Sequence, residues 1–441
     1  MDFLTNPDSA HAFTRRLFLQ RGVALASAAT TIPLLLERSA EAFAAPEGLS
    51  SIPGVAEERV LVVVQLAGGN DGLNTVIPYG MDAYYRARPG IGVAQGEALA
   101  LDERAGVGLH PRLAGLKALH DDGMLSVVQG VGYPNPDRSH FRSMDIWHTA
   151  DTSATGAGWL GKFFDNECEG APGQAHAGCS ACAPLAGVAI GQEAPLAMQG
   201  RRTAPASFER AELLRWSAAG DERLAAAYDE IVGAGAPNGV GPDGEAAFLM
   251  RTALDARVSS EQIRRAVAAS NAGVYPRSDL GGQLAMVGAM IRAELPTRVY
   301  YVSLGGFDTH AGQGGAQGRH ANLLAQFGDA IRAFYSDLRA AGQDGRVLTM
   351  VFSEFGRRVG QNASGGTDHG AAAPMFLVGP MVRAGLVGAH PSLDDLDNGD
   401  LRYGVDFRRV YGTILSEWMG ADQRAVLGRR YAPVKTLVRG L

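Results

Sequence analysis

Cysteine and net positive charge are both scarce in this chain of 441 residues. Three cysteines cannot complete a four-cysteine zinc site. The 40 Lys and Arg residues are outnumbered by 46 Asp and Glu, and no basic stripe is present, which argues against a nucleic-acid-binding protein. No long apolar run occurs beyond one segment near the N-terminus, so we expect a mature protein that does not span a membrane.

Glycine is abundant, with 58 residues, but it follows no fixed period. That pattern indicates many tight turns between regular elements rather than a low-complexity tract. Hydrophobic residues make up 46% of the chain, an ordinary share for a globular protein with a sizeable core. The length permits one large α/β domain, and no internal repeat is present.

Residues 1–44 have the organisation of an export signal. Arg15 and Arg16 precede a mildly apolar run, residues 23–36, and the small-x-small sequence at residues 42–44 fits a cleavage site. The run is too short to span a bilayer comfortably, although a short amphipathic helix or an anchor is the alternative. We therefore expect a twin-arginine signal, the twin-arginine translocase as partner, and a periplasmic or secreted mature protein.

The cysteines allow two structural roles. An oxidising compartment permits a disulfide. The C-x-x-C pair could instead belong to a small metal knuckle with His176 nearby. The sequence does not say which two would pair among Cys168, Cys179 and Cys182.

Apolar runs alternate with amphipathic segments along the mature chain. Strands are expected at residues 60–66, 124–131, 298–304, 346–353 and 373–379. Helices are expected at residues 110–123, within 137–150, at 321–342 and at 407–420. This alternation predicts an α/β fold with a mostly parallel central sheet and helices on both faces. We expect one domain over residues 45–441, with a mainly helical insertion at about 151–295.

Polar and charged clusters lie beside each of these apolar runs. Parallel sheets bind ligands beyond the carboxyl ends of their strands, so the clusters are candidates for one shared site. Their carboxylates and imidazoles could hold one or two divalent cations, namely zinc, manganese, calcium or magnesium. The clusters contain Asn70 and Asp71; Asp137, Ser139 and His140; Asp308 and His310; Glu354 and Arg357; and Asp368 and His369.

Each cluster also has an ordinary structural interpretation. Loops are rich in Asp, Gly and His, so one cluster alone is compatible with a turn. Ser139 could cap a helix as readily as it could act as a nucleophile near an anionic group. Glu354 ends a buried strand, where an uncompensated carboxylate is costly, so it could instead form an ion pair with Arg357 or Arg358.

A series of motifs resembles the bacterial domain-of-unknown-function family 1501. The resemblance covers about residues 58–440 of the mature chain. It rests on "TRRLFL", "QLAGGNDGLNT", "SHFRSMDIW", "GGFDTH", "SEFGRR" and "GTDHG", in that order. The family is similar in fold to the alkaline phosphatase and sulfatase superfamily, which implies an α/β hydrolase with one or two metals.

The resemblance also implies roles for single residues. Asp71 would be the early aspartate that bridges metals, and Ser139 stands near the nucleophile position, with His140 as a further catalytic or ligand candidate. The remaining metal ligands would be Asp308, His310, Glu354, Asp368 and His369. One departure stands out, because Glu354 and Phe355 replace the superfamily's Asp-His pair.

Three functional hypotheses follow. The first is an exported hydrolase of phosphate or sulfate esters that uses Ser139 or a water molecule as nucleophile. The second is a non-catalytic periplasmic binding or assembly protein that keeps the fold, which the altered Glu354 position favours. The third is a hydrolase with one metal only. In the hydrolase hypotheses the partner molecule is an anionic ester, and none of the three involves nucleic acid.

Overall fold

The computed structural model describes residues 59–168, 185–201, 203, 205–211, 259–269 and 274–437. The expected export signal, with Arg15 and Arg16, lies outside these residues, as do Cys179 and Cys182. Cys168 closes helix α7 (Trp159–Cys168). Both the signal and the disulfide therefore stay predictions. No helix in the described part of the chain is long and apolar enough to cross a membrane.

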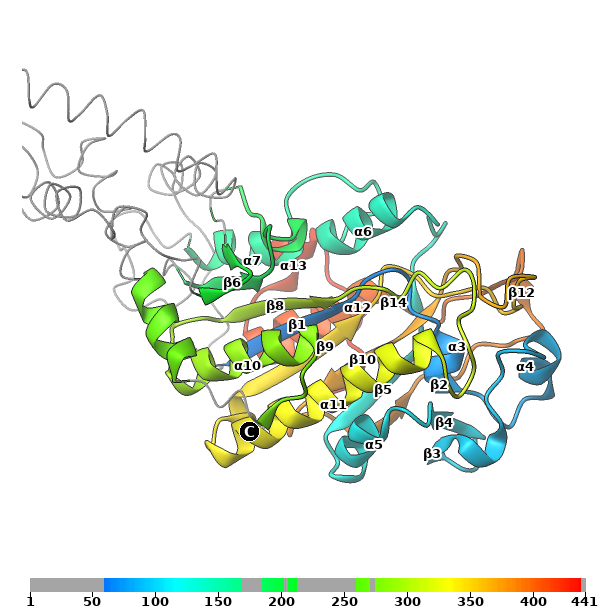
Figure 1. The fold of residues 1–441 in the computed structure, drawn as a ribbon. Coiled ribbons are helices and arrows are strands. Elements are labelled where there is room, and N and C mark those ends of the chain that lie inside the picture. The colour runs from blue at the N-terminus through cyan, green and yellow to red at the C-terminus, as the bar shows by residue number, and fades with distance from the viewer. Residues whose placement is uncertain are drawn as a thin grey trace, which may run out of the picture.

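A nine-stranded sheet forms the centre of the molecule (Figure 1), in the order β11-β5-β10-β9-β1-β8-β6-β7, with β14 also paired to β5. The expected strands are present as β1 (Val60–Leu66), β5 (Leu125–Gly132), β8 (Val299–Leu304), β9 (Val347–Phe352) and β10 (Ala373–Val378). Further strands are β6 (Gly187–Ile190), β7 (Ala206–Phe208), β11 (Gly385–Val387) and β14 (Val405–Asp406).

The sheet is parallel except at β10. Strand β1 pairs in parallel with β8 and β9, whereas β10 is antiparallel to both β9 and β5. The beginning of β10 consequently lies at the same edge of the sheet as the ends of the parallel strands. The loop that precedes β10 can thus reach the loops that follow β1, β8 and β9.

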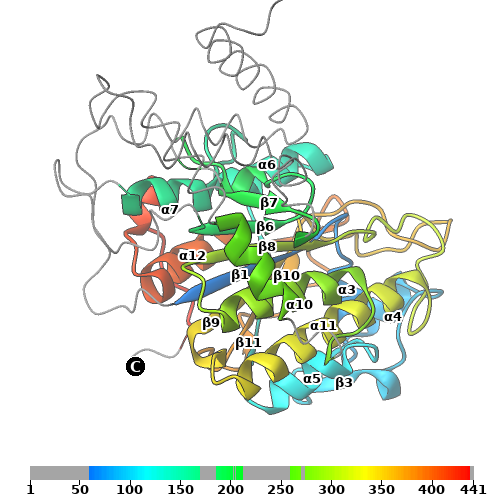
Figure 2. The same ribbon diagram turned by 60° about the vertical axis from the view of Figure 1, so that its left-hand side comes forward.

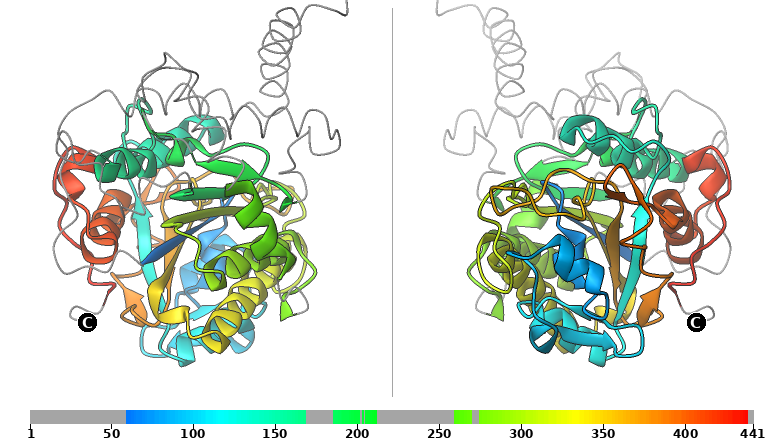
Figure 3. Two further views of the ribbon diagram at one scale, coloured as in Figure 1. Left: turned by 90° about the vertical axis from the view of Figure 1, so that its left-hand side faces the viewer. Right: turned by 90° about the vertical axis from the view of Figure 1, so that its right-hand side faces the viewer.

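Helices cover both faces, because alternate residues of β1 point to opposite sides. On one side Val62 and Val64 pack with α5 (Ala114–Asp121), α10 (Asp279–Arg292) and α11 (Arg319–Ala340). On the other side Leu61 and Val63 pack with α6 (His140–Thr149), α7 and α12 (Phe407–Thr413). Figures 2 and 3 show α11 and α12 on opposite sides of the sheet. The predicted α/β architecture is confirmed.

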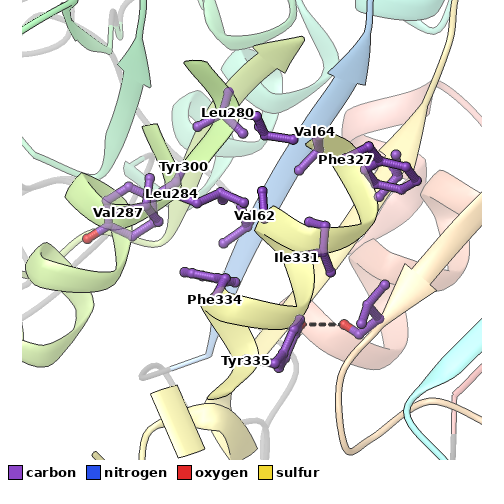
Figure 4. Packing of buried hydrophobic residues seen from close by; sticks show 14 of the residues in the cluster. Val62, Val64, Leu280, Leu284, Val287, Tyr300, Phe327, Ile331, Phe334 and Tyr335 are labelled. Atoms are coloured by element: carbon purple, nitrogen blue, oxygen red, sulfur yellow. Dashed lines mark hydrogen bonds between the residues drawn. The ribbon is translucent and has the colours of Figure 1, made fainter. Parts of the chain in front are cut away.

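The first of these cores is tightly built around β1. Figure 4 shows Ile331 and Phe334 of α11 close to Val62, with Leu284 of α10 on the neighbouring side. All four side chains are fully buried. Each large buried side chain contributes roughly 1.5–3 kcal/mol through the hydrophobic effect. This core fixes the strands whose ends carry the polar clusters.

Several short elements complete the fold. They are α3 (Gly72–Thr75), β2 (Val76–Ile77), α4 (Asp82–Ala87), β3 (Leu99–Asp102), β4 (Val107–Leu109), the β12–β13 hairpin (Leu396–Asp397 and Asp400–Leu401) and α13 (Gln423–Leu427). The expected closing helix divides into α12 and a π-helical segment, Ile414–Met419.

The range expected to form a mainly helical insertion also contributes to the sheet. Helices α7 and α10 lie within residues 151–295, but so do β6 and β7. Strand β6 pairs in parallel with β8, and β7 extends the sheet beyond it. These strands of four and three residues are too short to produce a recognisable apolar run, so the sequence pattern did not reveal them.

Candidate metal centre

Three of the predicted site residues meet at the carboxyl edge of the sheet. His140 begins α6, Asp308 follows β8, and His369 precedes β10. One ligand atom from each lies within 4.8 Å of the other two. Nε2 of His140 and Nε2 of His369 lie 3.6 and 3.3 Å from Oδ1 of Asp308, respectively. We refer to these three residues as the triad.

Both imidazoles of the triad are held through their other nitrogen. Nδ1 of His140 lies 2.9 Å from Oε1 of Glu354, and Nδ1 of His369 lies 2.7 Å from the carbonyl oxygen of Arg138. Carboxylate and carbonyl oxygens only accept hydrogen bonds, so Nδ1 carries the proton in both rings. When the rings are neutral, each Nε2 therefore presents a lone pair toward Asp308.

This arrangement fits a cation. Nε2 of His140 is buried and has no hydrogen-bond partner within the described residues, an uncommon state for a polar atom. Two nitrogen lone pairs and a carboxylate oxygen repel one another. Arg357, 2.7 Å from that oxygen, offsets part of this repulsion, and a cation among the three atoms would offset the rest. Histidines whose Nδ1–H is bound by a carboxylate or carbonyl are the usual ligands of protein metal sites.

The ionisation states also suit metal binding. Burial opposes ionisation of Asp308, but the hydrogen bond and charge of Arg357, together with His310 and His369, lower its pKa to about 2. Burial lowers the pKa of His369 from its ordinary value, and the positive charge of Arg357 acts in the same direction. At neutral pH Asp308 is thus anionic and His369 neutral, the forms that coordinate metals.

Arg357 connects the loops that surround the triad. Its guanidinium is almost fully buried and donates to the carbonyl oxygens of Gly68, Gly69, Phe307 and Thr367. It also donates to Oδ1 of Asp308 at 2.7 Å. One side chain therefore ties the loops after β1 and β8 to the loop before β10.

A comparison with protein families agrees with the resemblance noted in the sequence. The family described as "Protein of unknown function (DUF1501)" matches residues 125–432. The chain belongs to this family. A sequence comparison with curated proteins gives no match.

The solved structures that match this chain have low identity and low TM-scores. They include a Vibrio parahaemolyticus protein in the alkaline phosphatase superfamily (10% identity, TM-score 0.39, covering 90% of this chain and 78% of that one). Another is the C-terminal periplasmic domain of EptC from Escherichia coli in complex with Zn (13%, 0.34, 76% of each chain). A third is the lipoteichoic acid synthase LtaP from Listeria monocytogenes (8%, 0.31, 79% and 72%).

Glu354 contacts His140 on the side of the ring away from Asp308 and so orients this histidine of the triad. Its Oε1 accepts from the backbone N–H of Gly68 at 2.8 Å as well as facing His140. The alternative ion pair of Glu354 with Arg357 or Arg358 is wrong, because Arg357 pairs with Asp308 and Arg358 with Asp400. Glu354 is 1% exposed and contacts His140 of the triad, and its own predicted ligand role stays a prediction.

His310 lies beside the triad on the same carboxylate. Its Nδ1 is 2.8 Å from Oδ1 of Asp308, and its ring centre is 4.6 Å from that of His369. The His310 side chain is 44% exposed, so its remaining edge is accessible to solvent or substrate. Its predicted ligand role stays a prediction. A partly exposed imidazole at this position could equally transfer a proton.

Asp71 lies apart from the triad in a buried ion pair. Oδ2 of Asp71 accepts from Arg88 at 2.6 Å and from Gln313 at 2.5 Å. Burial opposes its ionisation, but the charge of Arg88 prevails and lowers the pKa of Asp71. Oδ1 of Asp71 has no partner among the described residues. Asp71 is not one of the three residues whose ligand atoms lie within 4.8 Å of one another, and its metal-bridging role stays a prediction.

Two other predicted residues also lie outside the triad. Asp368 is exposed, and its Oδ1 accepts from Nδ2 of Asn362. Ser139 is the exposed N-cap residue of α6, although its side chain makes no capping hydrogen bond. Its backbone N–H donates to Oδ1 of Asp137 at 2.8 Å. The nucleophile role of Ser139 stays a prediction, supported by its position directly before His140.

Sequence reasoning missed several groups that contact the triad and the buried residues around it. The carbonyl of Arg138, the side chain of Gln313 and the buried Arg88 all lie in loops or at a helix end. A backbone carbonyl leaves no residue-type signal. A glutamine within the Gly-rich sequence "HAGQGG" has no periodic pattern that distinguishes it from an ordinary loop residue.

Proposed function

We propose that this chain is a metal-dependent hydrolase of phosphate or sulfate esters that holds one divalent cation with His140, Asp308 and His369. The observation that carries the proposal is the convergence of two Nε2 atoms and one carboxylate oxygen, with both Nδ1 atoms held by acceptors. Asp71, the residue expected to bridge two metals, is paired with Arg88 instead, and this favours a site for one metal.

The donor set favours zinc among the four metals considered. Imidazole nitrogen suits zinc, whereas calcium and magnesium prefer oxygen ligands. Two histidines and one carboxylate form a typical catalytic zinc set, which leaves a position for substrate. When bound, the cation would supply Lewis-acid stabilisation of the negative charge that develops during ester cleavage.

The chain's own residues would position the ester. Helix α6 begins at His140, so the N–H groups of its first turn point toward the site and favour an anionic group. Ser139 is exposed at this helix end, and either its hydroxyl or a water molecule would attack the ester. His310 is in a position to exchange a proton with the attacking or leaving oxygen, because its ring is partly exposed beside Asp308.

We also propose that the chain is exported by the twin-arginine pathway to the periplasm or beyond. The support is the sequence of residues 1–44, with Arg15 and Arg16 before the apolar run. Replacing both arginines with lysine should retain the full-length precursor in the cytoplasm. Unchanged export of the Arg15→Lys, Arg16→Lys variant would contradict this part of the proposal.

A screen of phosphate and sulfate esters tests the hydrolase. The zinc-loaded protein should release phosphate or sulfate from at least one ester class, and Asp308→Asn should abolish that release. Ser139→Ala separates the two nucleophiles, because full activity in this variant would exclude serine attack. A folded, metal-loaded protein without activity on any ester would favour the alternative binding or assembly role.

A further inference from the structure

Gln313 is a buried connection between the two loops that carry Asp308 and His369. Its Oε1 accepts from the hydroxyl of Thr309 at 2.9 Å and from the hydroxyl of Thr367 at 2.8 Å. Thr309 directly follows Asp308, and Thr367 stands two residues before His369. Gln313 and both threonines are fully buried.

The orientation of the Gln313 amide is fixed by its partners. Its other end lies 2.5 Å from Oδ2 of Asp71, which can only accept a hydrogen bond because the carboxylate is ionised. The amide NH₂ must therefore face Asp71, and the amide oxygen faces the two threonines. Each hydroxyl donates to one of the two lone pairs of that oxygen. No other arrangement satisfies all four groups.

Asp71 is in turn held by a second anchored side chain. Arg88 donates to Asp71, and it also donates to the carbonyl oxygens of Arg358 and Val359 in the loop that follows β9. Asp71 and Arg88 are both buried, with 0% and 1% exposure. Gln313 thus connects the loops that carry Asp308 and His369 to the buried ion pair between Asp71 and Arg88.

We propose that Gln313 is a positioning residue that sets the distance between Asp308 and His369 through Thr309 and Thr367. The inference rests on the proposed metal site, and it adds the residue that keeps Asp308 and His369 at a fixed distance. Metal ligands must lie within about 0.2 Å of their ideal distances, so two loops that carry ligands need a rigid connection. The backbones of the loops also meet at Thr367 N–H and Thr309 C=O, 3.2 Å apart.

The test compares variants that differ in a single hydroxyl. Thr309→Val removes the hydroxyl and keeps the branched shape, whereas Thr309→Ser keeps the hydroxyl. The affinity for Zn²⁺ and the visible absorption spectrum of bound Co²⁺ are measured for both and for the unaltered protein. Thr309→Val should bind Zn²⁺ roughly 10–100-fold more weakly and change the Co²⁺ spectrum, because supporting groups of metal ligands have effects of this size. Thr309→Ser should match the unaltered protein.

Thr367→Val and Thr367→Ser form an independent pair on the other loop, and the same difference is expected. Circular dichroism establishes that each variant is folded, and one folded valine variant is enough for the comparison. Folded valine variants with unaltered Zn²⁺ affinity and Co²⁺ spectrum would overturn the role of Gln313 while leaving the metal site intact. An unaltered protein that takes up neither ion would overturn both the metal site and the positioning role.

Discussion

Nδ1 of His140 lies 2.9 Å from Oε1 of Glu354, so a buried carboxylate holds the histidine whose Nε2 faces Asp308. A Glu at this position is a departure from the Asp-His pair of the superfamily that the sequence resembles. In this chain the departure has a clear structural use, because the carboxylate supports a histidine from α6. The structure brings His140, Asp308 and His369 together, and the ligand roles predicted for the other residues stay predictions.

Glu354→Gln should weaken zinc binding by roughly 10–100-fold, since it removes the charge that orients His140 and keeps the side-chain volume. Asp368→Asn is the matched control on a neighbouring loop, because the Asp368 carboxylate contacts Asn362 and lies outside the triad. Isothermal titration with Zn²⁺ measures both. Equal affinities for the two variants would show that Glu354 does not support the site.

Arg88→Met should lower the free energy of unfolding by about 3–5 kcal/mol, because it leaves the buried carboxylate of Asp71 without its cation. Arg86 provides the control, since its contact with Asp394 is 3.7 Å long and exposed on both sides. Arg86→Met should change the free energy by about 1 kcal/mol or less. Urea unfolding of the two variants measures the difference, and similar losses in both would contradict the buried role.

Acid should destabilise the fold between about pH 6.5 and pH 4. Burial lowers the pKa values of His148 and His320 to about 4, whereas an unfolded histidine titrates near 6.5. The unfolded chain therefore binds more protons in this window, and the free energy of unfolding falls as the pH is lowered. The expected loss is on the order of 3 kcal/mol for each histidine.

Unfolding by urea at a series of pH values measures this slope. His320→Gln removes one of the two buried imidazoles and should make the slope shallower. His120→Gln is the control variant, because the His120 side chain is partly exposed on α5, whereas His320 is fully buried. A slope that is identical in all three proteins would exclude His320 as a source of the acid sensitivity.

The main strands and helices could be predicted because their apolar periodicity is strong. The direction of β10 could not, because an apolar run reads the same in a parallel and an antiparallel strand. This direction matters for function, since it brings His369 to the edge where Asp308 lies. Polar residues beside strand ends predicted that candidate residues would gather at one edge of the sheet, and His140, Asp308 and His369 do lie together there. The pattern did not separate these three from the residues that contact them.

Asp71 illustrates that limit. Its position after β1 made it a natural ligand candidate, yet Arg88, seventeen positions along the chain, returns to pair with it. The contact between Arg88 and Asp71 depends on the path of the loop after α4. A local sequence pattern cannot predict that path. Gln313 was missed for the same reason, because two of its three partners, Asp71 and Thr367, lie in other segments.

Metal content tests the central claim most directly. The mature protein, purified without chelator after native export, is analysed by mass spectrometry together with His140→Ala and Asp308→Asn. We expect about one zinc ion per chain in the unaltered protein. The folded variants should contain none, because each lacks one of the three side chains that hold the ion. A folded, metal-free protein that takes up no added zinc, manganese, calcium or magnesium would contradict the metal site and favour a binding or assembly role.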